Sequence, residues 1–176
     1  MNEFYFSEAV VLSKEPIGEA DVRVSLYAKN FGRILARAKS ARKITSKLAA
    51  HLEPGNLIKA RVIEQGGVQV VDALKIRKVD ISPANLHYLD QILADGDYDE
   101  EVWNFVSGAV GLHWGKVLRA LGWDPSLALC HSCEVNRPAA FEIASQNFFC
   151  SECVLNFTVG EGRGFKSQAV NLISIS

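Results

Sequence analysis

The sequence predicts an α+β protein in which an N-terminal five-stranded β-barrel is followed by a small helical domain with a four-cysteine motif. Three observations lead to this expectation: strand-type residue patterns in the first 78 residues, a change to helical spacing near residue 82, and two Cys-x2-Cys pairs closer to the C-terminus. The chain has 176 residues, 48% of them hydrophobic, which is enough for two small domains. We place the domain boundary after residue 80, with the cysteine motif at 130–153.

Short strands separated by turns account for the first part of the chain. Apolar and polar residues alternate in some of these segments, and β-branched and aromatic residues are frequent in others. The predicted strands are 4–14, 21–29, 33–39, 56–65 and 68–77. A short helix is expected at 45–52, and Gly66-Gly67 suits a tight hairpin between the last two strands. This order of elements is that of an OB-fold barrel.

Helical spacing begins at Ser82-Pro83, where a serine N-cap precedes a proline at the first helical position. A longer amphipathic helix is expected at 100–121, with an acidic cluster at its N-terminal end, where the helix dipole favours negative charge. After the cysteine motif we expect a tail, 154–176, in which the glycine-rich stretch 160–164 is flexible. Residues 81–176 are thus expected to form the helical domain.

The four cysteines predict one structural Zn²⁺ site. Two pairs with two intervening residues each, joined by a short hairpin, present four thiolates in the spacing of a zinc ribbon. The predicted ligands are Cys130, Cys133, Cys150 and Cys153. Disulfides would need an oxidising compartment, and a redox motif would need a strand-to-helix context that neither pair has. His131 adjoins the first pair and is expected to be a bystander.

The N-terminal residues lack the basic and apolar regions of an export signal. No apolar run approaches the length of about 18 residues that crosses a bilayer. We therefore expect a cytoplasmic protein without membrane contact.

Charge is divided unevenly along the chain. Up to residue 80 there are 14 Lys and Arg against 9 Asp and Glu, whereas the remainder has 5 against 11. Residues 29–47 contain seven bases and no acid. Such an imbalance favours a polyanion-binding N-terminal half, although a basic run can also be merely solvated.

The basic run coincides with the third strand and the loop after it, which are parts of an OB-fold that generally hold nucleic acid. Residues 1–80 are therefore expected to bind nucleic acid. The predicted phosphate-binding residues are Arg33, Arg37, Lys39, Arg42, Lys43 and Lys47, of which the first three should share one strand face. Tyr27 and Phe31 are possible base-stacking residues, with core or turn packing as the simpler interpretation.

No catalytic residue is predicted, and we expect the protein not to be an enzyme. Four histidines are scattered, and no serine or cysteine has an evident base partner. The acidic residues at 95–101 lack the glycine and distal glutamate of a calcium loop, so helix capping accounts for them better.

Six stretches of the sequence are distinctive together: Ile17-Gly18-Glu19-Ala20-Asp21, Asn30-Phe31-Gly32-Arg33, Ala38-Lys39-Ser40-Ala41-Arg42-Lys43, Ser46-Lys47-Leu48-Ala49-Ala50, Leu52-Glu53-Pro54-Gly55 and Leu118-Arg119-Ala120-Leu121-Gly122-Trp123-Asp124-Pro125-Ser126-Leu127. These stretches resemble the RecO family of recombination mediators. They occur in the family's order and cover most of the chain. The family usually has a longer helical domain, so the resemblance implies a shortened form in which residues 167–173 begin the family's next helix.

The resemblance implies a nucleoid-associated protein of DNA damage repair and recombination that binds single- and double-stranded DNA and anneals complementary strands. It also implies RecR as a partner, the acidic tail of single-strand-binding protein as a ligand, and help in loading RecA.

A tail of that kind needs a cation beside an apolar groove, which points to Lys116 and Arg119 with Leu118 and Trp123 nearby. The simpler interpretation is that both cations only stabilise a helix C-terminus. The alternative function is a zinc-ribbon and OB-fold adaptor that binds structured RNA or a protein.

Overall fold

The structure is a computed structural model that describes residues 4–159 and 171–175. The chain forms two compact units, Met1–Leu112 and His113–Ser176. Among the described residues, no helix has both the length and the apolar character that would let it cross a membrane.

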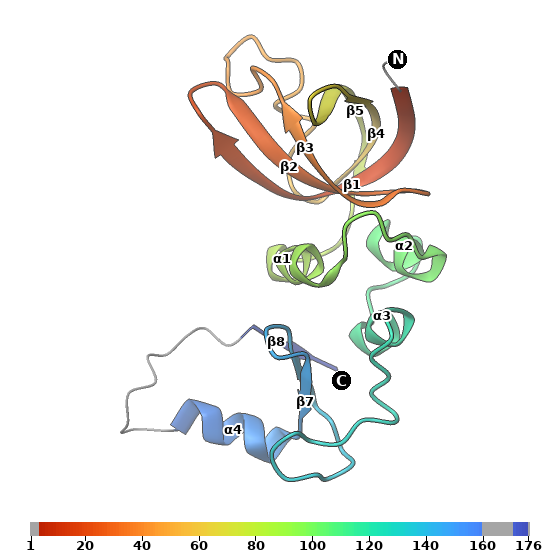
Figure 1. Ribbon diagram of the computed structural model, residues 1–176, viewed down its shortest axis with the longest axis vertical. Coiled ribbons are helices and arrows are strands. Elements are labelled where there is room, and N and C mark those ends of the chain that lie inside the picture. The colour runs from red at the N-terminus through yellow and green to blue at the C-terminus, as the bar shows by residue number, and fades with distance from the viewer. Residues whose placement is uncertain (1–3, 160–170, 176) are drawn as a thin grey trace. The chain divides into compact units, whose positions relative to one another are not determined.

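A closed five-stranded barrel forms most of the first unit (Figure 1). Its strands are β1 (Phe4–Ile17), β2 (Asp21–Ala28), β3 (Gly32–Ala38), β4 (Asn56–Glu64) and β5 (Val68–Lys78). They follow one another around the barrel in the order β1-β2-β3-β5-β4, which is consistent with an OB-fold. The five predicted strands are therefore confirmed, with ends that differ by at most a few residues.

Strand alternation separates the barrel's apolar interior from its outer face. On β2 the interior residues are Val22, Val24, Leu26 and Ala28, and on β3 they include Ala36 and Ala38. The intervening residues point outward, and the antiparallel register places Arg23 opposite Arg37, Ser25 opposite Leu35 and Tyr27 opposite Arg33.

The barrel closes between β3 and β5, and little backbone pairing joins these two strands. The only registered pair between them is Arg37 with Gln69, in a parallel arrangement. Nearer its start, β3 instead pairs with the segment that connects the two helices described next: Arg33 forms a parallel bridge with Asp95, and the Gly96 amide donates to the Arg33 carbonyl at 2.9 Å. The first part of β3 thus takes a partner from beyond the barrel.

The helix predicted at 45–52 is wrong. Residues 39–55 form turns and bends, and the amides of His51 and Leu52 both donate to the Leu48 carbonyl at 3.1 Å, which makes a single turn. The side-chain amide of Asn56 donates to the Ala50 and His51 carbonyls at 3.2 and 3.0 Å. Because this buried side chain uses those carbonyls, the turn does not need to continue as a helix to satisfy them.

Two short helices follow the barrel within the first unit. α1 (Pro83–Ile92) begins with the predicted cap, because the Ser82 hydroxyl accepts from the Asn85 amide. α2 (Glu100–Val106) is capped by Asp99, whose carboxylate accepts from the Val102 amide at 2.9 Å. Capping therefore accounts for part of the acidic cluster, as expected.

The predicted long helix at 100–121 is wrong in its length. α2 ends at Val106, and α3 (Trp114–Ala120) is a separate helix that belongs to the second unit. Gly108 adopts φ +74°, which no continuous α-helix allows, and Gly111 follows before α3 begins. The apolar residues before and after the break have the spacing of a single helix. The two glycines nevertheless divide this segment into two helices.

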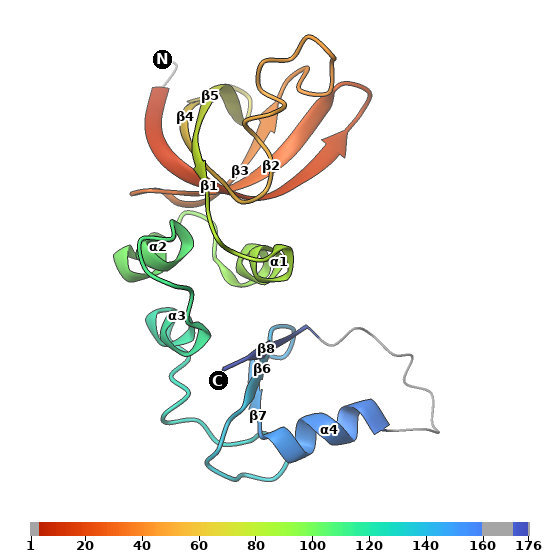
Figure 2. The same ribbon diagram turned by 180° about the vertical axis from the view of Figure 1, so that it is seen from behind.

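α1 and α2 cover one part of the barrel's outer surface, and both views show them against the same end of the barrel (Figure 1, Figure 2). Tyr27 of β2 packs against Trp103 of α2, with ring centroids 6.3 Å apart, and stacks on Tyr98 at 6.4 Å. Val10, which alternates with the interior residues of β1, is also fully buried. The first unit therefore extends to Leu112, whereas the sequence places a boundary after residue 80.

The second unit contains a small sheet and two helices. The sheet has the order β7-β6-β8, formed by β6 (Ala140–Glu142), β7 (Asn147–Phe149) and β8 (Leu172–Ser174). Its aromatic core joins Phe141 to Phe148 at 5.0 Å and to Trp123 at 5.3 Å between ring centroids.

The predicted tail is structured in part. Its first residues belong to helix α4 (Ser151–Val159), and residues 172–173, expected to lie in a helix, are in strand β8. The stretch 160–164, predicted to be flexible, lies outside the described residues.

Candidate functional site

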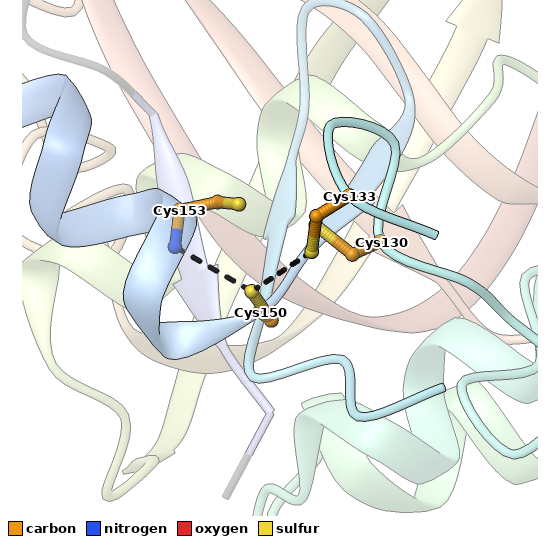
Figure 3. A group of neighbouring side chains, drawn as sticks. All are labelled: Cys130, Cys133, Cys150 and Cys153. Atoms are coloured by element: carbon orange, nitrogen blue, oxygen red, sulfur yellow. Dashed lines mark hydrogen bonds between the residues drawn. The ribbon is translucent and has the colours of Figure 1, made fainter. Parts of the chain in front are cut away.

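The four cysteines converge in the second unit, and Figure 3 shows their side chains turned toward one another. All four sulfur atoms lie within 4.8 Å of one another, and the Cys133 and Cys150 sulfurs are 3.6 Å apart. All four cysteines are free. The sequence spacing therefore corresponds to a spatial cluster.

Local structure holds the two pairs in different ways. Cys130 and Cys133 flank a tight turn, in which the Glu134 amide donates to the Cys130 carbonyl at 2.8 Å and Glu134 adopts φ +60°. Cys150 directly follows β7 and Cys153 lies in the first turn of α4, so β7 and α4 position the second pair. The Cys153 amide donates to the Cys150 sulfur at 3.4 Å (Figure 3).

Backbone N–H groups and neighbouring thiols shift the pKa values in the cluster. Burial raises the pKa of Cys130, but the amides of Cys150, Cys133 and Ser132 outweigh it and lower that pKa to about 6. Hydrogen bonds with the Cys150 and Cys133 side chains raise the pKa of Cys153 to about 12. The cluster favours a thiolate at one sulfur and a thiol at another, and a divalent cation changes that balance by deprotonating its ligands.

This geometry fits a tetrahedral metal site. A Zn–S distance of about 2.3 Å places tetrahedral sulfurs about 3.8 Å apart, which is within the spread of the cluster. Four sulfur ligands would leave no open position for a substrate, so the arrangement suits a structural ion. His131 packs edge-on against Phe149 with ring centroids 5.9 Å apart, in keeping with a bystander role.

Arg33, the first predicted phosphate-binding residue, lies under α1 and the segment that follows it. Its guanidinium forms ion pairs with Asp90 at 3.0 Å and with Asp95 at 2.5 Å, and only 17% of its side chain is exposed. Two carboxylates already neutralise this cation. We therefore leave Arg33 out of the candidate nucleic-acid surface, where strand alternation alone had placed it.

Arg37 and Arg42 are exposed and each has one partner in the barrel. Arg37 donates to the Asp21 carboxylate from Nε at 2.6 Å, and Arg42 donates to the Gly18 carbonyl at 3.0 Å. The Ser40 amide also donates to Asp21 at 2.7 Å. Together with Arg37, this amide holds the pKa of Asp21 below its usual value. Asp21 thereby fixes the start of the basic loop, defined here as residues 39–47, beside β2.

Lys39, Lys43 and Lys47 project from the basic loop. All three are exposed, and none forms an ion pair with any residue in 4–159 or 171–175. The structure thus brings five of the six predicted residues onto the exposed surface around the end of β3, and places Arg33 elsewhere.

The two candidate stacking residues have other roles. Tyr27 is 1% exposed beneath Tyr98 and Trp103, and burial raises its pKa to about 12. Phe31 contacts Tyr5 edge-on at 5.2 Å between centroids, at the mouth of a cavity of about 260 Å³ in the barrel. The packing interpretation of both rings is therefore the one that the structure favours.

Sequence reasoning missed Arg23. Its side chain is 56% exposed on the outer face of β2, directly across from Arg37. The signal was available, because strand alternation at 21–29 places residue 23 on the outer face. The acid-free run at 29–47 does not identify Arg23, because this residue lies before the run.

Lys116 and Arg119 line an open groove of about 460 Å³ in the second unit, together with His113, Pro125 and Pro138. Arg119 also pairs with Asp124 at 3.3 Å. The expected apolar neighbours are not among the lining residues: Leu118 is fully buried, and Trp123 packs against Phe141. The two cations are thus brought together, but Pro125, Pro138 and Ile175 rather than those side chains supply the apolar walls.

Known proteins resemble the chain over both units. Residues 1–79 match the family described as Recombination protein O N terminal. The "DNA repair protein RecO" of Bifidobacterium longum is 26% identical over 174 residues, covering 83% of this chain and 72% of that protein. The protein of the same name from Cutibacterium acnes is 37% identical over 67 residues, covering 38% of this chain and 27% of its own.

A third relative, "DNA repair protein RecO" of Thermodesulfovibrio yellowstonii, is 48% identical over 50 residues, or 28% of this chain and 20% of that protein. The barrel with its basic loop carries the family match, and the longer alignment continues beyond it. The chain is thus similar to RecO proteins, through the family match of residues 1–79 and through the longer alignment.

Proposed function

We propose that this chain is a non-enzymatic DNA-binding and strand-annealing protein that acts as a recombination mediator in DNA repair. The observation that carries the proposal is the basic loop, in which Lys39, Lys43 and Lys47 are exposed and form no ion pair with the described chain. It lies in the part of the chain that matches the RecO family. A role of this kind would be exercised in the cytoplasm, on the nucleoid.

Unpaired surface lysines are suited to phosphate because they release counterions condensed on DNA, which gives affinity without sequence readout. Annealing follows from the same contacts. A protein that neutralises phosphates on two strands reduces their repulsion, while the base edges stay free to pair. The reaction needs no catalytic group, so it requires no enzyme site.

We further propose that Cys130, Cys133, Cys150 and Cys153 bind one structural Zn²⁺. Their sulfurs are close enough to share an ion, and a cation would stabilise the Cys130 thiolate, which the backbone amides already favour. The role of these residues is to fix the turn at 130–134 to the junction of β7 and α4.

The partner roles proposed from the family are binding of RecR, capture of the acidic tail of single-strand-binding protein, and help in loading RecA. The groove beside Lys116 and Arg119 supports the second, because it joins two cations to apolar walls. A charge-reversed Lys116→Glu/Arg119→Glu variant should lose affinity for a peptide of that tail. Arg137→Glu, at an exposed position in the same unit, is the control and should not.

A salt titration of DNA binding tests the main proposal. Fluorescence anisotropy with single- and double-stranded DNA should show affinity that falls steeply with salt and depends little on sequence. A Lys39→Ala/Lys43→Ala/Lys47→Ala variant should weaken binding roughly tenfold or more and lower the salt slope by about three. Unchanged affinity in that variant would contradict the proposed surface.

The control removes the same charge from other strands of the barrel. Lys59, Lys75 and Lys78 are exposed on β4 and β5, and their triple alanine variant should bind DNA nearly as the wild type does. An equal loss in both variants would indicate a general effect of net charge.

A strand-annealing assay, with and without single-strand-binding protein, then tests the activity itself. Strong preference for one folded RNA, or a lack of DNA binding, would instead favour the adaptor function.

A further inference from the structure

We propose that the outer face of β2 and β3, next to the basic loop, binds the sugar–phosphate backbone of DNA without stacking its bases, and that Arg23 belongs to this site. The inference rests on the proposed DNA-binding function and adds to it a residue and a mode of contact. It follows from which half of this sheet face is covered, from the arginines on the open half, and from the aromatic side chains that are missing there.

The covered half is the one nearer α1 and α2. Ser25 and Tyr27 on β2 are each 1% exposed, and Arg33 on β3 is held by Asp90 and Asp95. A strand of DNA has no access to these residues in the folded unit. The part of the β2–β3 face that remains open therefore lies toward the other end, where β3 leads into the basic loop.

Arg23 and Arg37 dominate the open half. They lie directly across from each other on neighbouring strands, and their side chains are 56% and 54% exposed. Like charges in this position destabilise a sheet, so an anion that binds both arginines would relieve their repulsion. Asp21 compensates Arg37, whereas the nearest carboxylate oxygen to Arg23 is that of Glu15, 4.0 Å away. Arg23 is thus the less neutralised of the two.

The arginine pair is continuous with the basic loop. Asp21 binds both the Arg37 guanidinium and the Ser40 amide, which ties the end of β3 to the loop. Arg42 binds the Gly18 carbonyl of the β1–β2 turn through its side chain, and its amide donates to the Ala20 carbonyl at 2.8 Å. Cations from β2, β3 and the loop therefore form one surface, on which successive phosphates of a strand can each meet a positive charge.

Aromatic platforms are missing from this surface within the described chain. Tyr27 is the one aromatic residue of β2 and is buried, and the exposed large apolar residue between the arginines and the covered half is Leu35, at 43%. The most exposed aromatic ring of the barrel, Phe6, lies on β1 opposite Arg61 of β4. Stacking contributes strongly wherever single-stranded nucleic acid is held by its bases, so its absence points to contact through the backbone.

Competition between a normal and an abasic strand tests the mode of contact. A labelled single-stranded DNA is displaced either by an unlabelled strand of the same length or by one that lacks every base and keeps every phosphate. If the bases are not stacked, the two competitors should differ by less than roughly threefold, whereas each stacked base would contribute roughly tenfold. A polyglutamate of equal charge is the third competitor and should be much weaker.

Substitution of Arg23 tests the residue. Arg23→Gln should raise the dissociation constant roughly threefold to tenfold for both kinds of strand and lower the salt slope by about one. Arg23→Lys should restore most of the affinity, because it keeps the charge. Lys59→Gln, at an exposed position of β4, is the matched control for loss of one charge and should have little effect.

The outcomes separate this inference from the function on which it rests. If the wild-type protein binds no DNA, the proposed function fails. If it binds DNA but the abasic strand competes poorly, or Phe6→Ala weakens binding as much as Arg23→Gln does, bases are stacked and the inference fails. If Arg23→Gln binds like the wild type, Arg23 is not part of the site. If polyglutamate competes as well as DNA, the face recognises acidic protein instead.

Discussion

Different interactions stabilise the interior of each of the two compact units. The first has a barrel interior of aliphatic side chains, with α1 and α2 packed on its outer surface. The second has a three-stranded sheet with three residues in each strand, a small aromatic cluster, and four cysteines gathered at one place. A domain with so little core generally needs a metal or disulfides, because its buried apolar area cannot offset the entropy of folding.

Because the two units are stabilised differently, different changes should unfold each of them. The first unit depends on apolar packing and on ion pairs between barrel and helices, and it contains none of the cysteines. Perturbations of the cysteines should therefore affect residues 113–176 selectively, and perturbations of the contacts of Arg33 should affect the first unit.

The largest effect is expected from loss of the proposed structural metal. Removal of Zn²⁺ by a strong chelator, or a Cys150→Ser substitution, should unfold the second unit, since structural zinc contributes about 10 kcal/mol in small domains. Hydrogen exchange measured by mass spectrometry should show loss of protection in the sheet β7-β6-β8 and retention in the barrel. DNA binding by the barrel is the control and should persist. Unchanged protection in the second unit after complete metal removal would contradict a structural role.

A second large effect is expected at Gly32. A Cβ atom there would lie 2.2 Å from the Asp97 carbonyl oxygen, and Gly32 adopts φ +70°. Gly32→Ala should destabilise the first unit by about 2–4 kcal/mol in urea unfolding, because it adds a backbone clash to the strain of a left-handed conformation.

Gly18 provides the matched control for this prediction. It has a similar φ of +56°, and a Cβ atom there would meet nothing within 4 Å. Gly18→Ala should therefore cost only about 1 kcal/mol, which is the strain alone. Equal effects of the two substitutions would show that the segment at Asp97 does not approach β3 closely.

A smaller effect separates Arg33 from Arg37, which lie four residues apart on the same face of β3. Arg33→Gln leaves the partly buried Asp90 carboxylate without its cation and should lower the free energy of unfolding of the first unit by about 1–3 kcal/mol. Arg37→Gln breaks a pair whose arginine is exposed and should cost less than about 1 kcal/mol. DNA binding should respond in the opposite order. A larger loss of DNA affinity from Arg33→Gln than from Arg37→Gln would contradict our exclusion of Arg33.

The smallest effect concerns pH. Burial raises the pKa of Asp90, but the hydroxyls of Ser25 and Ser13 and the guanidinium of Arg33 outweigh it, so the net shift is downward. A carboxylate with a lowered pKa stabilises the folded state above its unfolded pKa, near 4, and loses this contribution as the pH falls through its folded value. Asp90→Asn should therefore reduce the acid dependence of unfolding as the pH falls below about 4. If unfolding of the Asp90→Asn variant had the same acid dependence as that of the wild type, this would contradict a lowered pKa of Asp90.

Much of this fold was predictable because local sequence determines it. Alternation in β2 and β3, the cap at Ser82 and the cysteine spacing each act over a few residues, and all agree with the structure. Two helices were predicted wrongly because local side-chain and glycine effects outweigh the apolar pattern. The turn at 45–52 is fixed by Asn56, whose side-chain amide binds the Ala50 and His51 carbonyls. The apolar face of 100–121 is interrupted at Gly108 and is divided between two helices in different units.

The candidate site was also predictable where local sequence determines it. Lys39, Lys43 and Lys47 belong to a loop whose composition alone suggests exposure. The environment of Arg33 depends on carboxylates about 60 residues later in the chain, which no periodicity in β3 reveals.

The pairing of β3 with Asp95 and Gly96 determines where the chain can be cut to give a stable fragment. A fragment that ends at residue 80 would lack Asp95 and Gly96, so the first part of β3 would become an open edge, and Val10 and Tyr27 would be exposed beside it. Open edges with apolar neighbours promote association between copies. A fragment of residues 1–112 keeps that edge paired. The smallest soluble, monomeric form of the first unit should therefore include both helices, and limited proteolysis should release this longer piece rather than the bare barrel.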